Sequence, residues 1–392
     1  MDKELTQVKL EYICEFRNGK IKTNSLNLNT YISTENMLPE KFGITTSAGL
    51  PTTQFTQEFC KNDVLISNIR PYFKKIWYAK QNGGCSNDVL IFKVKENYYP
   101  KFLYYVLSED KFFDYATSTS KGTKMPRGDK NAILQYLAPN LSLSTQQAIA
   151  ATLSCLDNKI ELNNKINANL EAQAQAIFKN WFVDFEPFQC GKFVDSELGK
   201  IPEEWKIISF SKFITERNEK SNDQTIPEYS VTNTGIYPRD DKFKKKLSAI
   251  TSKNKLAYNT DMVFGMSREI LNWGMMKEDI GGFSSAYHIY KVADNIHPLF
   301  LESFIKFHSS YFKDLIKPAS REGQGVDKSV LFSKSVYFPP NDILEEYYTV
   351  GRSLLEHTMI NNQQSRALAA IRDALLPKLM NGDIEVGEEI YE

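Results

Sequence analysis

The chain has few of the residues from which metal sites, disulfide frameworks and common catalytic centres are built. It contains five cysteines and four histidines among 392 residues. The cysteines are scattered without a Cys-x-x-Cys pair, which is typical of proteins in a reducing compartment. The histidines lack partners at the spacing of zinc ligands. We therefore expect no bound metal, no cofactor and a cytoplasmic location.

Long apolar runs and an excess of one charge are also missing. No run approaches the roughly 18 apolar residues of a membrane span, and the N-terminal stretch MDKELTQVKL is polar. We expect neither a membrane span nor a signal peptide. Lys plus Arg and Asp plus Glu both number 48, so the net charge is zero. This total does not indicate nucleic-acid binding, although basic faces can exist within it.

The motifs of self-contained enzymes are absent as well. The sequence has no GxxxxGK(S/T) phosphate loop, no GxGxxG fingerprint, no HExxH zinc motif and no GxSxG nucleophile elbow. Asp63 and Asp261 each precede a predicted strand, where a lone aspartate is typical of a turn or cap. We therefore predict a non-catalytic chain without catalytic residues.

Two long stretches carry a heptad pattern, in which apolar residues alternate at steps of three and four. Ranges 141–186 and 341–381 are predicted to be helices, and nearly 40 residues of helix span roughly 55–60 Å. A long core helix is the plainer alternative, but the strict alternation favours a coiled coil. The predicted seam residues are Leu153, Leu156, Ile160, Asn163, Leu170 and Ile177, and Leu354, Asn361, Leu368, Ile371 and Leu375.

Both stretches carry an Asn-Asn pair near the middle, Asn163-Asn164 and Asn361-Asn362. Polar residues in a seam weaken a coiled coil but fix its register and orientation. If the two helices pair antiparallel within the chain, these polar patches face each other. The alternative is that the asparagines face solvent.

The two halves of the chain repeat each other about 200 residues apart. Asp63-Val64-Leu65-Ile66 recurs as Asp261-Met262-Val263-Phe264, and Gly83-Gly84 recurs as Gly281-Gly282. Many such matches in one order, ending in matched helices, indicate a duplication.

Each copy is predicted to be a globular α/β part followed by its long helix. The domain limits are 1–140 and 205–340 for the globular parts, 187–204 for a linker and 382–392 for a tail. Strands are expected at 63–69, 74–79 and 89–94, with a turn at 82–84, and at 262–266 and 287–292 in the second copy. Helices are expected at 101–116 and 299–315.

Basic residues recur in loops at equivalent places of the two copies. Lys and Arg neutralise phosphates, and Arg also reads base edges, so we predict that these loops bind DNA. For any single residue, a solvated surface charge is an equally good explanation. The candidates are Arg17, Lys20, Arg70, Lys74, Lys75, Lys121, Lys124, Arg127, Arg217, Lys220, Lys244, Lys245, Arg268, Arg321 and Lys328.

At this point the chain resembles the specificity (S) subunit of type I restriction–modification systems. The resemblance is carried by AIFKNWFVDFEPF at 176–188, SELGKIPEEW at 196–205 and ALLPKLMNGDIEV at 374–386, and by the two-copy layout over nearly the whole chain. One departure is that the first copy begins with QVKLEYICEF and lacks the LGxIPxxW entry that precedes the second.

The resemblance implies an α/β (α+β) fold with two pseudo-repeated target recognition domains and two long helices forming an antiparallel intramolecular coiled coil. Each domain would read one half of an asymmetric bipartite site in double-stranded DNA. The helices would set the spacer and dock two methyltransferase (M) subunits, with motor-nuclease (R) subunits in the full complex. The alternatives are a coiled-coil scaffold without DNA specificity and a stand-alone nuclease, which the missing catalytic set disfavours.

Overall fold

The computed structural model describes residues 6–221, 223, 225–239, 254–267, 270–316 and 326–386. It divides into two compact units. The first unit runs through Asn164 and resumes at Asn362, and the second runs from Lys165 to Asn361. The borders fall at the two Asn-Asn pairs, so each unit contains part of each long helix.

The first unit is built on two four-stranded sheets. One is antiparallel with the order β2-β9-β6-β7, and the other has the order β3-β5-β8-β4 and contains one parallel pairing, between β4 and β8. A small sheet pairs β1 with β10. The strands are β1 Gln7–Lys9, β2 Cys14–Phe16, β3 Lys20–Lys22, β4 Tyr31–Ile32, β5 Phe55–Phe59, β6 Val64–Ser67, β7 Ile76–Tyr78, β8 Gly83–Cys85, β9 Val89–Val94 and β10 Leu137–Pro139.

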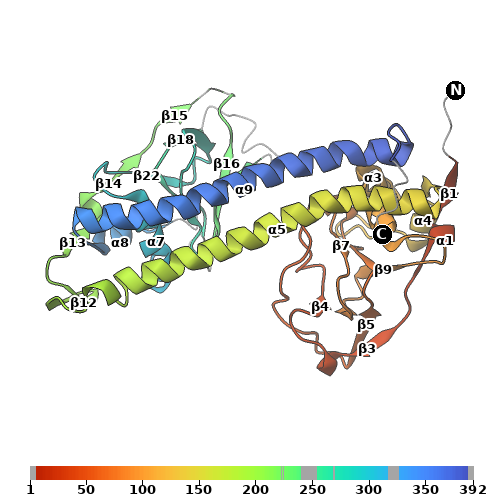
Figure 1. Cartoon of the computed structure of the whole chain (residues 1–392), viewed down its shortest axis with the longest axis horizontal. Coiled ribbons are helices and arrows are strands. Elements are labelled where there is room, and N and C mark those ends of the chain that lie inside the picture. Colours follow the sequence, from red (N-terminus) through yellow and green to blue (C-terminus); the bar gives the residue numbers. More distant parts are fainter. Residues whose placement is uncertain are drawn as a thin grey trace. The chain divides into compact units, whose positions relative to one another are not determined.

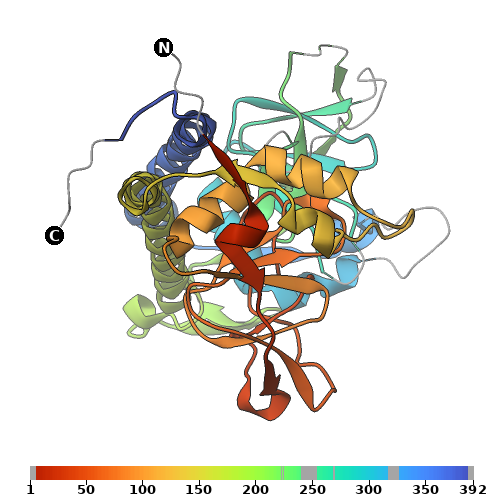
Figure 2. The ribbon, with the colours of Figure 1, turned by 90° about the vertical axis from the view of Figure 1, so that its right-hand side faces the viewer.

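Short helices cover the sheets of the first unit and lead into the long helix (Figures 1 and 2). They are α1 Leu10–Ile13, α2 Pro100–Ser108, α3 Asp110–Ser118 and α4 Lys130–Leu134, with 3-10 turns η1 Thr23–Ser25 and η2 Pro71–Phe73. The sequence predicts one helix over 101–116, but the backbone of Glu109 is extended (ψ 143°) and divides it into α2 and α3.

The long helices are α5 Leu143–Phe182 and α9 Asn341–Asn381. The start of α5 and the end of α9 complete the core of the first unit. Ile149 and Leu153 of α5 and Leu379 of α9 are buried in one cluster with residues of β2, β6, β9 and α2. None of the described helices is both long and apolar enough to span a membrane.

The second unit repeats this plan. Its main sheet has the antiparallel order β14-β22-β19-β20, beside a three-stranded sheet β15-β18-β21 and the pairs β16-β17, β13-β23 and β11-β12. The strands are β11 Phe193–Ser196, β12 Gly199–Pro202, β13 Lys206–Ser209, β14 Ile214–Arg217, β15 Lys220–Ser221, β16 Tyr229–Thr232, β17 Gly235–Pro238, β18 Asn254–Tyr258, β19 Met262–Phe264, β20 Trp273–Met275, β21 Ile280–Phe283, β22 His288–Val292 and β23 Ser335–Phe338.

The helices of the second unit are α7 Pro298–Phe307 and α8 Lys328–Ser333, with 3-10 segments η3 Glu186–Phe188, η4 Phe210–Lys212 and η6 Ser309–Leu315. The helix predicted over 299–315 is therefore α in its first part and 3-10 in its second. The predicted linker at 187–204 contains the hairpin β11-β12, and Trp205 directly after it is buried.

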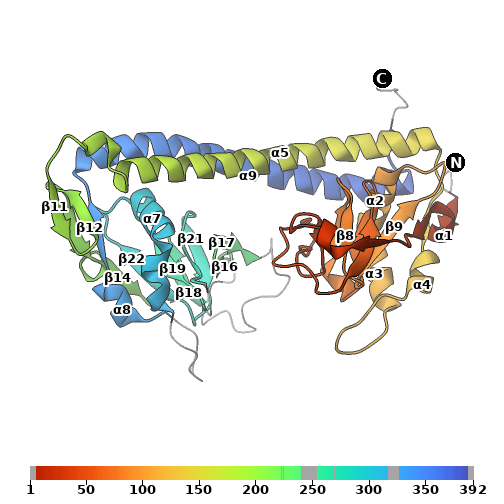
Figure 3. The same ribbon diagram turned by 90° about the horizontal axis from the view of Figure 1, so that it is seen from below.

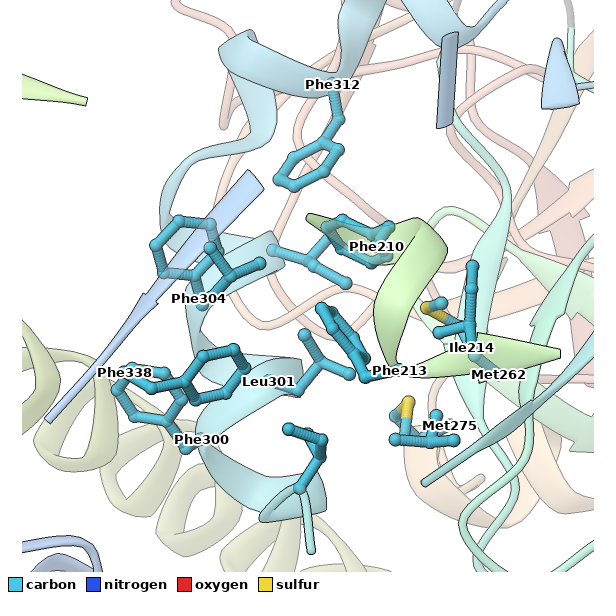
Figure 4. Packing of buried hydrophobic residues seen from close by; sticks show 14 of the residues in the cluster. Phe210, Phe213, Ile214, Met262, Met275, Phe300, Leu301, Phe304, Phe312 and Phe338 are labelled. Carbon is cyan, nitrogen blue, oxygen red and sulfur yellow. The ribbon is translucent and has the colours of Figure 1, made fainter. Parts of the chain in front are cut away.

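The core of the second unit is rich in aromatic rings. Figure 4 shows Phe300 and Phe304 of α7 packed with Phe210 and Phe213 of the η4 segment and with Phe338 of β23. Phe178 and Phe182 of α5 and Tyr347 of α9 enter the same cluster. Edge-to-face contacts such as Phe182 with Tyr347, at 4.9 Å between ring centroids, add to the burial energy.

Local details confirm that the two units are copies. Arg17 makes a bidentate contact with Asp63 (Nε to Oδ2, 2.5 Å), and Arg217 makes the same contact with Asp261 (2.6 Å). The carboxylate of each aspartate also accepts a hydrogen bond from the backbone N–H group three residues before it. The turn role predicted for both aspartates is therefore correct. Asp129 caps α4 through two N–H groups, and Asp327 caps α8 in the same way.

The Gly83-Gly84 pair is not the predicted turn but lies in strand β8, between β5 and β4. A Cβ on Gly83 would lie 2.2 Å from the carbonyl oxygen of Thr30. The glycine is therefore required by the close approach of another backbone and not by turn geometry.

In the first unit, α5 and α9 lie side by side and run antiparallel (Figures 1 and 3). Arg372 Nη1 donates to Asp157 Oδ1 at 2.9 Å, and Asn163 Nδ2 donates to Gln364 Oε1 at the same distance. The residue numbers rise on one helix as they fall on the other. Asn163 is fully buried, so it does not face solvent.

In the second unit the same antiparallel pairing continues. Asn361 Nδ2 donates to Asn167 Oδ1 at 2.8 Å, and the ring of Trp181 lies 6.3 Å from that of Tyr347. The polar residues near the middle of α5 and α9 therefore hydrogen-bond across the pair, as the antiparallel model predicts.

In the part of α9 near Ile371, the residue that faces α5 lies one position after the predicted seam residue. Ile371 is 48% exposed, whereas its neighbour Arg372 faces Asp157. The side chain of Arg372 is only 22% exposed and forms an ion pair across the seam, which a hydropathy pattern does not reveal.

Candidate nucleic-acid interface

A strained turn joins β6 to β7 in the first unit. Arg70 and Lys74 both adopt left-handed backbone conformations, at φ 50° and φ 51°, on either side of the 3-10 turn Pro71–Phe73. Such conformations cost a non-glycine residue about 1 kcal/mol or more, and they concentrate at functional sites. The side chains of Tyr72 and Phe73 point into solvent.

The basic loop after α3 is joined to this turn. Lys121 and Arg127 exchange both backbone hydrogen bonds, at 2.8 and 2.9 Å, which closes a hairpin around residues 122–126. The N–H of Arg70 donates to the carbonyl oxygen of Pro126 at 2.8 Å, and that of Gly128 donates to Asn68 at 3.1 Å. The loop extends beyond the helices and strands of its unit (Figures 2 and 3).

Four candidates that are distant in sequence therefore come together. We name this surface the hairpin face, and it consists of Arg70, Tyr72, Phe73, Lys121, Lys124, Met125 and Arg127. It combines cations with exposed aromatic and apolar side chains, which suits contacts to both phosphates and bases.

The cations of the hairpin face are held loosely. Arg127 pairs with Asp88 at 3.0 Å and Lys121 pairs with Asp129, but their side chains are 56% and 81% exposed. Exposed ion pairs contribute about 0–1 kcal/mol, so a phosphate can replace the carboxylate at little cost. Arg70 Nε is buried and has no hydrogen-bond partner within the described part of the chain.

Lys74 and Lys75, which we predicted to contact DNA, point into the protein. Lys74 is 7% exposed and its ammonium group lies 2.6 Å from Asp110 Oδ1, which Lys41 also contacts at 2.9 Å. Lys75 donates to the carbonyl oxygen of Thr34 at 2.6 Å, and burial lowers its pKa. These two lysines anchor the turn, so we leave them out of the interface.

Arg17 and Arg217 likewise have a structural partner, since each neutralises a buried aspartate, Asp63 or Asp261. Lys20 on β3 and Lys220 on β15 are exposed at the edges of their sheets. Neither is part of the hairpin face or of its counterpart.

The second unit has a turn equivalent to that of the first. Gly265 N–H donates to Asn272 O at 2.8 Å across it, and Met266 and Ile270 are exposed. Lys328 pairs with Glu216 at 2.6 Å at the start of α8. The candidates Lys244, Lys245, Arg268 and Arg321 lie outside the described residues.

Sequence reasoning missed the apolar members of the hairpin face, namely Tyr72, Phe73 and Met125. A signal was present, because Pro71 predicts a turn and two aromatic residues directly after it are placed where burial is difficult. Within the described residues, no three His, Cys, Asp or Glu side chains are placed to hold a metal ion.

Comparisons with known proteins agree with this architecture. A family model described as the type I restriction modification DNA specificity domain matches residues 2–172. The type I restriction enzyme MjaIX specificity subunit of Methanocaldococcus jannaschii is 28% identical over 309 residues, which cover 75% of this chain and 71% of that protein. The HindI specificity subunit of Haemophilus influenzae is 24% identical over 432 residues, which cover 90% of this chain and 94% of that protein.

A crystal structure of the type I restriction–modification S subunit from M. genitalium superposes with a TM-score of 0.50 at 14% identity, covering 97% of each chain. That similarity concerns the fold. The sequence motifs, the duplicated fold and the curated relatives agree: residues 2–172 match the type I restriction modification DNA specificity domain, and most of the chain is similar to type I restriction enzyme specificity subunits.

Proposed function

We propose that this chain reads an asymmetric, bipartite DNA site and breaks no bond itself. The observation that carries the proposal is the pair of units with the same main four-stranded sheet, the same helix caps and an equivalent turn, but different residues on the exposed loops. Two equivalent frames with different contact residues suit two different half-sites. In this proposal residues 1–140 and 205–340 are the two target recognition domains.

In the first domain, the hairpin face enters the major groove. All four base pairs are distinguishable there by their donors and acceptors. Lys121, Lys124 and Arg127 neutralise phosphates along the groove, and Arg70 donates hydrogen bonds to a base edge, most readily to guanine. In the second domain the turn with Met266 and Ile270 takes the corresponding place.

The paired helices α5 and α9 set the spacer between the half-sites and dock two methyltransferase subunits. Their cross-helix hydrogen bonds at Asn163 and Asn361 fix the register, which a ruler requires. The target adenine is flipped out of the duplex into the methyltransferase partner, where the chemistry occurs. The motor-nuclease subunits join the full complex, which acts on DNA in the cytoplasm.

The experiment is to co-express the chain with its neighbouring methyltransferase and to map methylated adenines on genomic DNA. A single bipartite motif with a constant gap is the expected result. A Lys121→Ala/Lys124→Ala variant should weaken methylation while the motif stays the same, because phosphate contacts carry no sequence information. A stable complex without new methylation would favour a DNA-free scaffold instead.

A further inference from the structure

The turn Pro71–Phe73 holds two aromatic rings in solvent. Tyr72 is 46% exposed and Phe73 is 38% exposed, and their ring centroids are 4.8 Å apart. Exposing aromatic surface forgoes the largest favourable term in folding. The rings are therefore placed at a cost, and the turn that presents them carries further cost in the backbone of Arg70 and Lys74.

The rings are held in position from both ends of the turn. On one side Arg70 N–H is fixed to Pro126 O at 2.8 Å, and on the other Lys74 is fixed to Asp110 at 2.6 Å. The carbonyl oxygen of Phe73 accepts from Glu40 N–H at 2.8 Å. The pair is thus preorganised, so little conformational entropy is lost when it meets a partner.

The surroundings of the rings select the kind of partner. Lys121, Lys124 and Arg127 lie on the hairpin that is bonded to the turn, and Met125 at its tip is 49% exposed. Cations around an apolar centre complement duplex DNA, because its phosphates flank a major groove whose floor includes the apolar methyl groups of thymine.

The second unit presents apolar side chains at the same turn. Met266 is 38% exposed and Ile270 is 60% exposed, between strands β19 and β20. The chemical types differ between the copies, but exposed apolar surface recurs. Apolar side chains gain nothing from contact with water, so their exposure at the same turn in both units indicates a binding role.

The edges of base pairs in the major groove carry one apolar group, the C5-methyl of thymine. Building on the function proposed above, we propose that Tyr72 and Phe73 contact a thymine methyl in the first half-site, and that Ile270 makes the equivalent contact in the second. These residues then determine specificity, because cytosine and the purines offer no methyl group at that place.

The test uses the full chain in complex with its methyltransferase partners, on a duplex carrying the mapped site. Each thymine is replaced singly by deoxyuridine, which removes only the methyl group, and binding is followed by fluorescence anisotropy. For the parent chain, replacing one particular thymine of the first half-site should raise the dissociation constant roughly threefold to fivefold. For the Tyr72→Ser/Phe73→Ser variant, the ratio of the dissociation constants for the deoxyuridine and thymine duplexes should fall to about one.

The other half-site and another exposed ring serve as controls. Ile270→Ser should remove the deoxyuridine effect in the second half-site alone, and Tyr12→Ser, whose ring is 60% exposed on α1, should change neither ratio. The melting temperature of each variant checks that it remains folded.

A ratio near one at every thymine with the unsubstituted chain, or a ratio that persists in the double variant, would overturn the methyl contact and leave bipartite reading intact. Loss of methyltransferase binding by the double variant, with no deoxyuridine effect, would assign the turn to protein docking. The absence of any bipartite motif would overturn both proposals.

Discussion

At the scale of single residues, the contact between Arg17 and Asp63 separates a structural arginine from a DNA-binding one. Arg17→Met leaves the Asp63 carboxylate, 3% exposed, with the bond from Cys60 N–H but without its cationic partner. An unpaired buried charge costs roughly 3 kcal/mol, so this variant should unfold at a clearly lower urea concentration. Lys20→Met, at an exposed site, should stay within about 0.5 kcal/mol. Equal stability of both variants would contradict the assignment.

A second prediction concerns Glu109, which lies between α2 and α3. Burial raises the pKa of its carboxyl from 4.5 to about 7. The folded state then holds a proton that the unfolded state has released, so stability is greatest at low pH and falls as the pH rises through 7.

Glu109→Gln removes this dependence. We expect the variant to match the parent at pH 5 and to exceed it by roughly 2 kcal/mol at pH 8. Thermal unfolding at both values measures the difference, and the exposed Glu96→Gln serves as control. A variant that is less stable at pH 8 would show that Glu109 is ionised and paired.

At the residue scale, the sequence did not reveal which basic side chains of the site face solvent. Lys74 and Lys75 look like surface cations in a basic loop, and their partners Asp110 and Thr34 are far away in sequence. The joining of Arg70 to Pro126 depends on the same long-range folding. Loop basicity was therefore predictable, but which cations face outward was not.

At the scale of elements, a substitution in strand β8 tests why a glycine pair is present in both copies. Gly83→Ala would place a Cβ 2.2 Å from a backbone oxygen and 2.6 Å from Phe59, so β8 has to move. We expect a loss of roughly 3 kcal/mol or insoluble protein. Gly282→Ala in β21 meets nothing closer than 3.7 Å and should cost less than about 1 kcal/mol. Parallel urea unfolding compares them, and equal losses would refute the steric explanation.

The long helices show what periodicity predicts and what it omits. The length and the polar layer follow from the spacing and the Asn pairs, whereas the antiparallel pairing was implied by the family resemblance, and all three are present. The register of α9 was displaced at Ile371, because the pattern counts apolar residues and assigns no value to an arginine paired across the seam. The break at Glu109 and the hairpin β11-β12 are short features that carry little periodic signal.

At the scale of the whole molecule, we predict that the spacer follows the length of the helices. Seven residues added to α5 near Asn164 and seven added to α9 near Asn361 keep the heptad phase and lengthen the pair by roughly 10 Å. The gap in the methylated motif should grow by about three base pairs, and both half-sites should stay unchanged. Methylome mapping would contradict this if the gap remained fixed while a half-site changed.

The composition of the first unit has a consequence for biosynthesis. Its core is closed by Leu376, Leu379 and Met380, which follow the entire second unit in the chain. On the ribosome, the domain that emerges first is therefore the last to be finished. Until translation is nearly complete, its apolar surface around Ile149 and Leu153 stays open to chaperones and proteases. A message truncated before Leu376 thus yields a product marked for removal rather than a half-functional DNA reader.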